Sequence, residues 1–189
     1  LSAGEWLQRQ VGVWKFEYEK RDVRRKSVHP ATYPIALARQ CIELFTHKGE
    51  LVLDPFAGSG TTMVAARDCV RSALGADLKW EFVDLAQSRL AAEPAAEGVA
   101  QHAVCTDARE LAGLVDPGTV ALLLTSPPYA NCLNRPRRNK SRRTEDRRNE
   151  QYGQVEQYSQ DPADLGTLAY KEYCEAVEGI FARLDRKSV

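Results

Sequence analysis

Two short segments of the chain combine residue types that hold and activate a small ligand. The first covers residues 54–62 with the sequence DPFAGSGTT, and its two glycines, Gly58 and Gly60, allow a backbone to approach a ligand closely. A helix that begins at Thr61 would offer unpaired N–H groups to a phosphate or a carboxylate. The segment has neither the lysine of a phosphate-binding P-loop nor the third glycine of a dinucleotide fingerprint. Taken alone, the glycines fit a structural turn as well as they fit a ligand site.

The second segment is Ser126-Pro127-Pro128-Tyr129, which directly follows Thr125. Its two prolines stiffen the backbone and remove two N–H donors, so carbonyl acceptors remain beside an aromatic ring. A rigid patch of acceptors next to an aromatic face suits a planar base that carries an amino group. Pro-Pro-Tyr by itself is also typical of plain loops and of ligands for WW domains.

The elements that must position these segments are predicted from apolar runs and helical spacing. Strands are expected at residues 51–53, 73–76, 103–105 and 120–124, and helices at 34–45, 61–67, 82–90 and 170–184. This alternation predicts an α/β fold with a parallel, doubly wound sheet. Each predicted strand is followed by a polar residue, in turn Asp54, Asp77, Asp107 and Ser126. Because a ligand binds beyond the carboxyl ends of such strands, we expect these side chains to meet at one site.

Together, the two segments resemble the cofactor and catalytic motifs of the amino-group DNA methyltransferases. Residues 29–34, HPATYP, are similar to the family's segment before the cofactor strand, and the resemblance covers residues 29–130. It implies a Rossmann-like methyltransferase sheet, S-adenosylmethionine as cofactor, and transfer of its methyl group to an exocyclic base amine in DNA. No covalent intermediate is needed, which agrees with the lack of the Pro-Cys pair of cytosine-ring methyltransferases.

The resemblance also implies a role for individual residues. Asp77 would accept hydrogen bonds from the ribose hydroxyls and Asp107 from the adenine amine, whereas Asp54 and residues 58–62 would hold the methionine part. On their own, Asp77 and Asp107 could equally be helix caps or turn residues. The implied cofactor-binding residues are His29, Pro30, Thr32, Asp54, Pro55, Phe56, Ala57, Gly58, Ser59, Gly60, Thr61, Thr62, Asp77 and Asp107.

The implied catalytic residues are Ser126, Pro127, Pro128 and Tyr129. Ser126 and the Pro127 carbonyl would accept hydrogen bonds from the target amine and draw its nitrogen toward tetrahedral geometry. Tyr129 would stack on the base after it leaves the helix. In this family, serine at the first motif position favours N4 of cytosine over N6 of adenine.

Domain boundaries are predicted from composition. Residues 1–28 form an N-terminal arm or short helix whose aromatic side chains are expected to pack on the main domain, and residues 29–189 form a partial methyltransferase catalytic domain. Within it, residues 131–164 are a basic loop that we expect to contact DNA phosphates, although a plain solvated loop has the same composition. The predicted DNA-binding residues are Arg135, Arg137, Arg138, Lys140, Arg142 and Arg143.

Bulk composition narrows the class of protein. The 189 residues suit one domain, and the 26 basic and 26 acidic residues cancel, so the net charge does not indicate nucleic-acid binding. No apolar stretch reaches the ~20 residues of a membrane span. The five cysteines are scattered without C-x-x-C pairs, which argues against a disulfide framework or a metal site and favours the reducing cytoplasm.

The family's sheet normally continues through further strands, and nothing after Leu184 can supply them. We therefore expect a sheet that stops after its fourth strand and is completed by a missing C-terminal segment or a second chain. The expected partner is double-stranded DNA, in a restriction-modification or related system. Two alternatives stay open, namely an RNA base-amine methyltransferase and an inactive remnant that binds cofactor or DNA.

Overall fold

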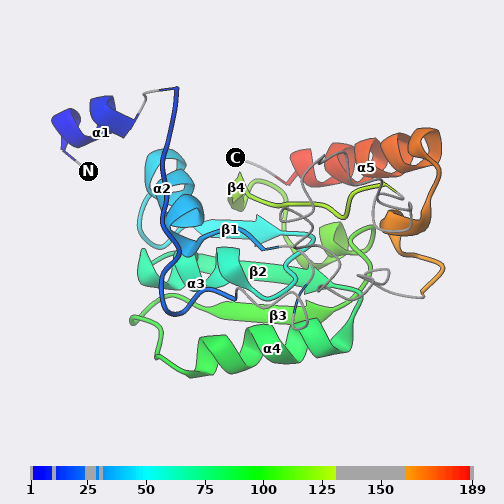
Figure 1. The fold of residues 1–189 in the computed structure, drawn as a ribbon, viewed down its shortest axis with the longest axis horizontal. Coiled ribbons are helices and arrows are strands. Elements are labelled where there is room, and N and C mark those ends of the chain that lie inside the picture. The colour runs from blue at the N-terminus through cyan, green and yellow to red at the C-terminus, as the bar shows by residue number, and fades with distance from the viewer. Residues whose placement is uncertain (1, 10–11, 24–28, 30–31, 131–160, 188–189) are drawn as a thin grey trace, which may run out of the picture.

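A single parallel sheet forms the centre of the molecule. The computed structural model describes residues 2–9, 12–23, 29, 32–130 and 161–187. In the order β3-β2-β1-β4, the four described strands are Gln101–Cys105, Ser72–Asp77, Leu51–Asp54 and Val120–Leu123 (Figure 1). The order reverses at β1, because β2 and β3 lie on one side of it and β4 lies on the other. Such a switch point opens a crevice at the carboxyl ends of the two strands that flank it.

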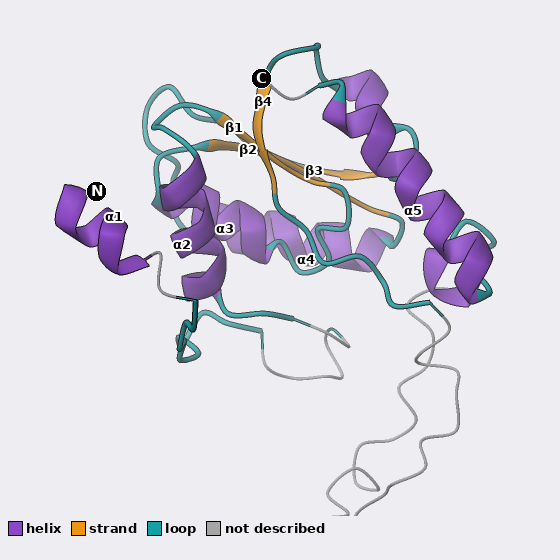
Figure 2. Cartoon of the chain, turned by 90° about the horizontal axis from the view of Figure 1, so that it is seen from above, coloured by secondary structure: helices purple, strands orange, loops and turns teal. Residues whose placement is uncertain are grey.

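Helices cover both faces of this sheet. α2 (Ile35–Phe45), α3 (Thr61–Asp68) and α4 (Trp80–Ala91) lie on one face, and α5 (Tyr170–Asp185) lies on the other (Figure 2). Because successive strand side chains point to opposite faces, Val52 packs into the core under α2, α3 and α4. Its neighbour Leu53 packs into the second core, with Ile180 and Leu184 of α5. Apolar runs without polar alternation are therefore required in these strands.

The predicted fold class, a doubly wound Rossmann-like sheet, is confirmed, and each predicted strand and helix is present. Within the described residues, two short 3-10 helices were not predicted. η1 (Leu111–Leu114) precedes β4, and η4 (Leu165–Thr167) directly follows the segment 131–164 that was expected to be a loop. Both contribute a leucine to the core under α5, so apolar side chains fix these turns.

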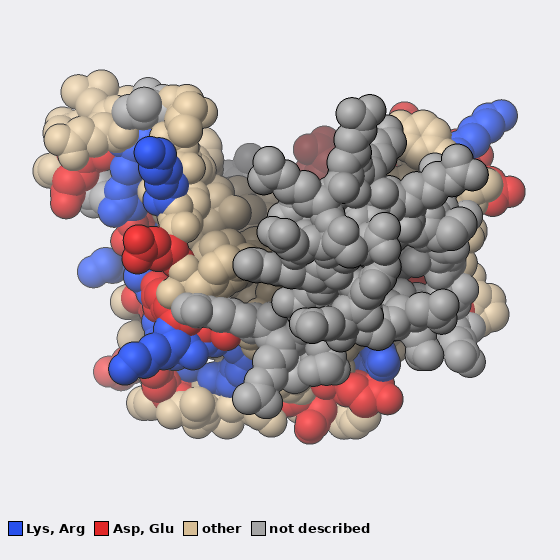
Figure 3. Space-filling view, in the orientation of Figure 1, with Lys and Arg blue, Asp and Glu red and all other residues tan. Residues whose placement is uncertain are grey.

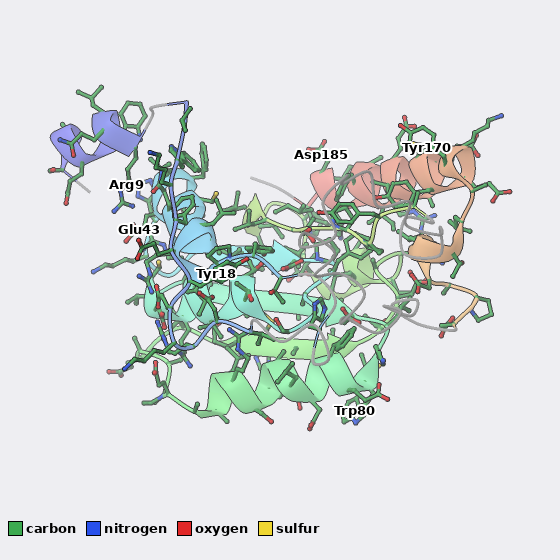
Figure 4. All side chains as sticks on the ribbon, viewed as in Figure 1. Arg9, Tyr18, Glu43, Trp80, Tyr170 and Asp185 are labelled. Atoms are coloured by element: carbon green, nitrogen blue, oxygen red, sulfur yellow. The ribbon has the colours of Figure 1, made fainter. Side chains whose placement is uncertain are left out.

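The N-terminal arm contains α1 (Ala3–Arg9) and is attached mainly through polar contacts. Arg9 forms an ion pair with Glu43 of α2, as Figure 4 shows. Trp6, Trp14 and Tyr18 keep 44%, 36% and 47% of their surface exposed, so the prediction that the arm's aromatic side chains pack on the main domain is wrong for these three. Hydrogen bonds and ion pairs hold the arm where apolar burial was expected.

The second half of the arm joins a network of opposite charges. Arg21 pairs with Asp68 at 2.7 Å, and Asp22 accepts a hydrogen bond of 2.9 Å from the backbone N–H of Ile35 at the start of α2. Acidic and basic side chains accordingly intermingle along this side of the molecule (Figure 3). His29, the next described residue after Val23, lies at the carboxyl edge of the sheet.

Beside β4, the chain after α5 returns to the sheet. The Lys187 carbonyl accepts hydrogen bonds from the N–H groups of Thr119 and Val120, at 3.2 and 3.0 Å. Completion of the sheet by a further segment or a second chain stays a prediction. The predicted DNA-binding residues 135–143 lie outside the described residues, as does Pro30. None of the helices in the described ranges is both long and apolar enough to cross a membrane.

Candidate functional site

A pocket opens at the carboxyl edge of the sheet, at the switch point between β1 and β4. Its volume is about 830 Å³, counting the space at its open mouth. Both motif segments contribute to its wall, together with the ends of β2 and β3. The predicted site residues that line it are His29, Thr32, Pro55, Phe56, Ala57, Gly58, Ser59, Thr61, Asp77, Asp107, Ser126 and Pro128. The tertiary structure therefore brings together residues that are far apart in the sequence.

Asp77 is the carboxylate that β2 delivers to this pocket. Its Oδ2 accepts a hydrogen bond of 2.9 Å from the N–H of Gly58, and its Oδ1 accepts one of 2.9 Å from the N–H of Lys79. Burial raises the pKa of Asp77 to about 6, and the nearby Asp54 and Asp164 act in the same direction, whereas the two N–H donors oppose it. A carboxylate has about four lone-pair sites, so two remain for donors from a ligand.

Asp54, at the end of β1, does not line the pocket, because it is buried directly behind the wall. Its Oδ1 accepts hydrogen bonds from the Phe56 N–H at 3.1 Å and from the Thr125 hydroxyl at 2.6 Å. Its Oδ2 accepts a hydrogen bond from the hydroxyl of Thr62. Burial raises the pKa of Asp54, and these donors offset part of that effect. Asp54 therefore ties the ends of β1 and β4 to α3, and the structure gives it a supporting position.

Thr62 and Gly60 share this position behind the wall. Thr62 donates its hydroxyl proton to Asp54, so the Tyr33 hydroxyl must be the donor in the Tyr33–Thr62 hydrogen bond. Burial raises the pKa of Tyr33, which keeps that proton in place. Gly60 packs against α4, where an added Cβ would lie 2.7 Å from the Cβ of Ala86. These residues shape the loop from behind.

Asp107 follows β3 and faces the same pocket, but it has a partner of its own. Its Oδ2 lies 2.7 Å from Nη1 of Arg109, and its Oδ1 accepts a hydrogen bond of 2.8 Å from the Arg109 backbone N–H. Asp107 is therefore a turn residue, as one of the two interpretations of the sequence predicted, because it binds the residue two positions ahead. The remaining lone pairs leave it able to accept a ligand amine as well.

His29 lines the pocket next to the glycine loop. Its ring lies against Phe82 in a tilted arrangement, with centroids 4.4 Å apart, and the Nζ of Lys79 lies 5.0 Å from the centroid of the same Phe82 ring. A Cβ added to Gly58 would lie 2.4 Å from Nε2 of His29, and Gly58 has φ +49°. Glycine is therefore required at this position for two reasons, a left-handed backbone and the contact with His29.

Two hydrogen bonds fix the chain between β4 and the catalytic segment. The Leu124 N–H donates to the Leu53 carbonyl at 3.0 Å, and the next residue, Thr125, is bound to Asp54. Ser126 and Pro128 then line the pocket, whereas Pro127 and Tyr129 do not. Tyr129 keeps 53% of its surface exposed, so its ring is accessible to a large partner.

Several pocket residues were missed by sequence reasoning. Ala163, Asp164 and Leu165 come from the segment before α5, and Asp164 is buried, with Oδ1 accepting a hydrogen bond of 2.8 Å from the Gly166 N–H. An aspartate one residue before a short helix is a capping pattern that could have drawn attention to this turn. Tyr33, Leu78, Lys79, Phe82, Thr106 and Ala108 also line the pocket.

Comparison with known proteins places this site in context. Residues 4–88 match the model of a family described as DNA methylase, N6_N4_Mtase. The Type II methyltransferase M.BglII of Bacillus subtilis is 33% identical over 93 residues, which is 49% of this chain and 26% of that protein. M.ScaI of Streptomyces caespitosus is 36% identical over 85 residues, or 43% of this chain and 28% of that protein. TrmN from Thermus thermophilus, a solved structure, has a TM-score of 0.45 at 26% identity, over 55% of this chain and 31% of that one.

The family match covers only part of the site. The family match ends at residue 88, so it includes the glycine loop and Asp77 but neither Asp107 nor residues 126–129. It begins at residue 4, inside the predicted arm. The alignments with M.BglII and M.ScaI span only about a quarter of each relative's length.

Proposed function

We propose that this chain, which is similar to DNA methylases over part of its length, binds S-adenosylmethionine in this pocket and transfers the methyl group to an exocyclic base amine in DNA. One observation carries the proposal. The glycine loop of residues 54–62 and the segment 126–129 both contribute residues to the wall of a single pocket, although they follow different strands. A donor site and an acceptor site that share one wall suit a direct transfer between two bound molecules.

The residues present fit the cofactor. The pocket is lined by residues at the carboxyl ends of all four described strands. Asp77 has acceptor capacity for two hydroxyl groups of a ribose. Ser59 and Thr61 border the N-terminus of α3, where free N–H groups favour a carboxylate. Phe82 and Leu165 supply apolar walls.

When bound, S-adenosylmethionine supplies a methyl group on a positively charged sulfur, which is open to attack by a nitrogen lone pair. The lone pair of an exocyclic amine is delocalised into the ring of the base. Hydrogen bonds from the amine to the Ser126 hydroxyl and the Pro127 carbonyl would localise it, and the exposed Tyr129 would stack on the flipped base. Most of the rate enhancement would then come from positioning and from preorganised polar groups.

The choice of base follows from Ser126, for which we propose N4 of cytosine over N6 of adenine. We also propose duplex DNA as partner, with the basic residues of the segment 131–164 contacting its phosphates. A reducing cytoplasm is the proposed location, because the described cysteines Cys41, Cys69, Cys105 and Cys174 are all free thiols.

Two measurements on the full chain test the proposal. Isothermal titration with S-adenosylhomocysteine, the product form of the cofactor, should show one site per chain. A tritiated-methyl assay should then label duplex DNA, and mass spectrometry of the digested nucleosides should identify N4-methylcytosine. Ser126→Ala serves as the control for transfer.

The result has three informative alternatives. N6-methyladenine would overturn the choice of base, and labelling of RNA but not DNA would overturn the choice of nucleic acid. Failure of the folded chain to bind S-adenosylhomocysteine would refute the cofactor site itself.

A further inference from the structure

Arg89, in the last turn of α4, reaches the glycine loop from behind. Its Nη1 donates a hydrogen bond to the Ser59 carbonyl and lies 3.3 Å from the Ser59 hydroxyl and 3.4 Å from the Thr61 hydroxyl. Its Nη2 donates to the Arg21 carbonyl of the arm at 3.2 Å. Arg89 does not itself line the pocket, whereas both Ser59 and Thr61 do. Its guanidinium therefore touches the back of two residues whose front faces the ligand.

The loop needs support of this kind. Gly58 and Gly60 both have left-handed backbones, with φ +49° and +75°, so the backbone between them is held by few regular contacts. Ser59 is buried, and its carbonyl lies one residue before that of the N-cap Gly60, which accepts the first hydrogen bond of α3, from the Val64 N–H. A buried carbonyl without a donor is costly, so the hydrogen bond from Arg89 stabilises this one orientation of the peptide.

The positive charge of Arg89 favours an anion at the same loop that its hydrogen bonds support. The N-terminus of α3 carries a partial positive charge that attracts an anion, and the guanidinium behind Ser59 adds a full positive charge. Arginine stays protonated at every physiological pH. Both effects favour a carboxylate bound in front of the loop. Arg89 binds Ser59, Thr61 and Arg21, whereas the proposed contacts of the adenosine are Asp77 and Asp107.

We infer that Arg89 is a positioning residue that holds the glycine loop in the form that binds the carboxylate end of the cofactor. The inference rests on the proposed function, because that function sets the carboxylate at the loop. A positioning role predicts different effects on two classes of ligand, whereas a merely structural role predicts the same effect on both. Loss of Arg89 should weaken ligands that carry the amino-acid end and spare ligands that lack it.

Two ligands separate these roles. S-adenosylhomocysteine carries the amino-acid end, and 5′-methylthioadenosine has the same adenosine and sulfur without it. Isothermal titration of Arg89→Gln should show affinity for the first reduced about tenfold or more, the range for a lost hydrogen bond to a charged group. Affinity for the second should change by less than about twofold.

Arg71→Gln is the matched control. Arg71 is a buried arginine whose guanidinium also binds carbonyl and hydroxyl oxygens, those of Cys69 and Thr46, at the opposite edge of the sheet. Its loss should lower stability and leave the ratio of the two affinities at the parent value. Arg89→Lys keeps the positive charge but loses the planar guanidinium that reaches both Ser59 and Arg21. Its loss of affinity for S-adenosylhomocysteine should therefore be smaller than that of Arg89→Gln, and affinity for 5′-methylthioadenosine should again be spared.

The outcomes are separable. An unchanged affinity for S-adenosylhomocysteine, or an equal loss for both ligands, in Arg89→Gln would overturn the role of Arg89. If that variant does not fold, the same comparison is made with Arg89→Lys, and an equal loss for both ligands would again overturn it. If the parent chain binds neither ligand, the proposed function fails first, and the role of Arg89 falls with it.

Discussion

Neutralising Asp77 should make cofactor binding weak and insensitive to pH. Asp77→Asn keeps the shape of the side chain but leaves one oxygen in place of two. In the parent chain the carboxylate accepts N–H bonds from Gly58 and Lys79, and the proposed ribose hydroxyls use its two remaining sites. The NH₂ group of asparagine cannot accept hydrogen bonds, so the donors that face this side of the side chain lose their acceptor. At pH 7.5 we expect affinity for S-adenosylhomocysteine to fall at least about tenfold, which corresponds to roughly one charged hydrogen bond.

The pH dependence follows from the raised pKa. Burial brings the pKa of Asp77 to about 6, so its carboxylate takes up a proton between pH 7 and 5. Hydroxyl donors favour the ionised form, so binding should be strongest above the pKa and be lost as the pH falls through it. About nine tenths of the group is ionised at pH 7 and about one tenth at pH 5, so affinity should drop up to about tenfold between them. Asp77→Asn should show no such drop.

Isothermal titration between pH 5 and 8 measures both effects, with circular dichroism as the check on folding. The free energy of unfolding should change by no more than about 2 kcal/mol, because losing an acceptor and relieving a buried charge oppose each other. Asp84→Asn, the same substitution on the exposed face of α4, should behave as the parent. Parent-like affinity in a folded Asp77→Asn chain, or an unaltered pH profile, would refute the assignment of Asp77.

Three further predictions address the wall, the catalytic segment and the backbone. Ser126→Ala and Tyr129→Ala should each slow methyl transfer about tenfold or more while S-adenosylhomocysteine affinity stays within about twofold, and loss of binding in a folded variant would contradict this division. Gly58→Ala should abolish measurable binding, since its Cβ would meet His29 at 2.4 Å, and adding His29→Ala should restore part of it in the same titration. Val70→Gly should raise the free energy of unfolding by about 1 kcal/mol in urea denaturation, because this β-branched residue has φ +60°; a decrease would show that its side-chain packing outweighs the strain.

The sequence by itself determined that this protein has a parallel sheet with helices on both faces. Uniformly apolar runs such as residues 51–53 and 120–124 can only be buried on both faces, so they predict parallel strands covered by helices. The polar residue after each run then falls at one edge of the sheet, because parallel strands share a direction. This is why the sequence alone predicts Asp77, Asp107 and Ser126 at one pocket.

Only the tertiary structure decided how each of these side chains is used. Asp54 has the same position at a strand end as Asp77, yet it is enclosed by hydroxyls, one of them from Thr125, 71 residues away. The sequence pattern reports burial and backbone direction, but a side chain's partners depend on which distant segments arrive beside it. For the same reason the contacts of Arg89 could not be predicted, nor the place of Asp164 in the pocket, although the capping pattern marks the turn at Asp164. Each acts through contacts made by the fold, in segments whose own residues show only a turn and a helix end.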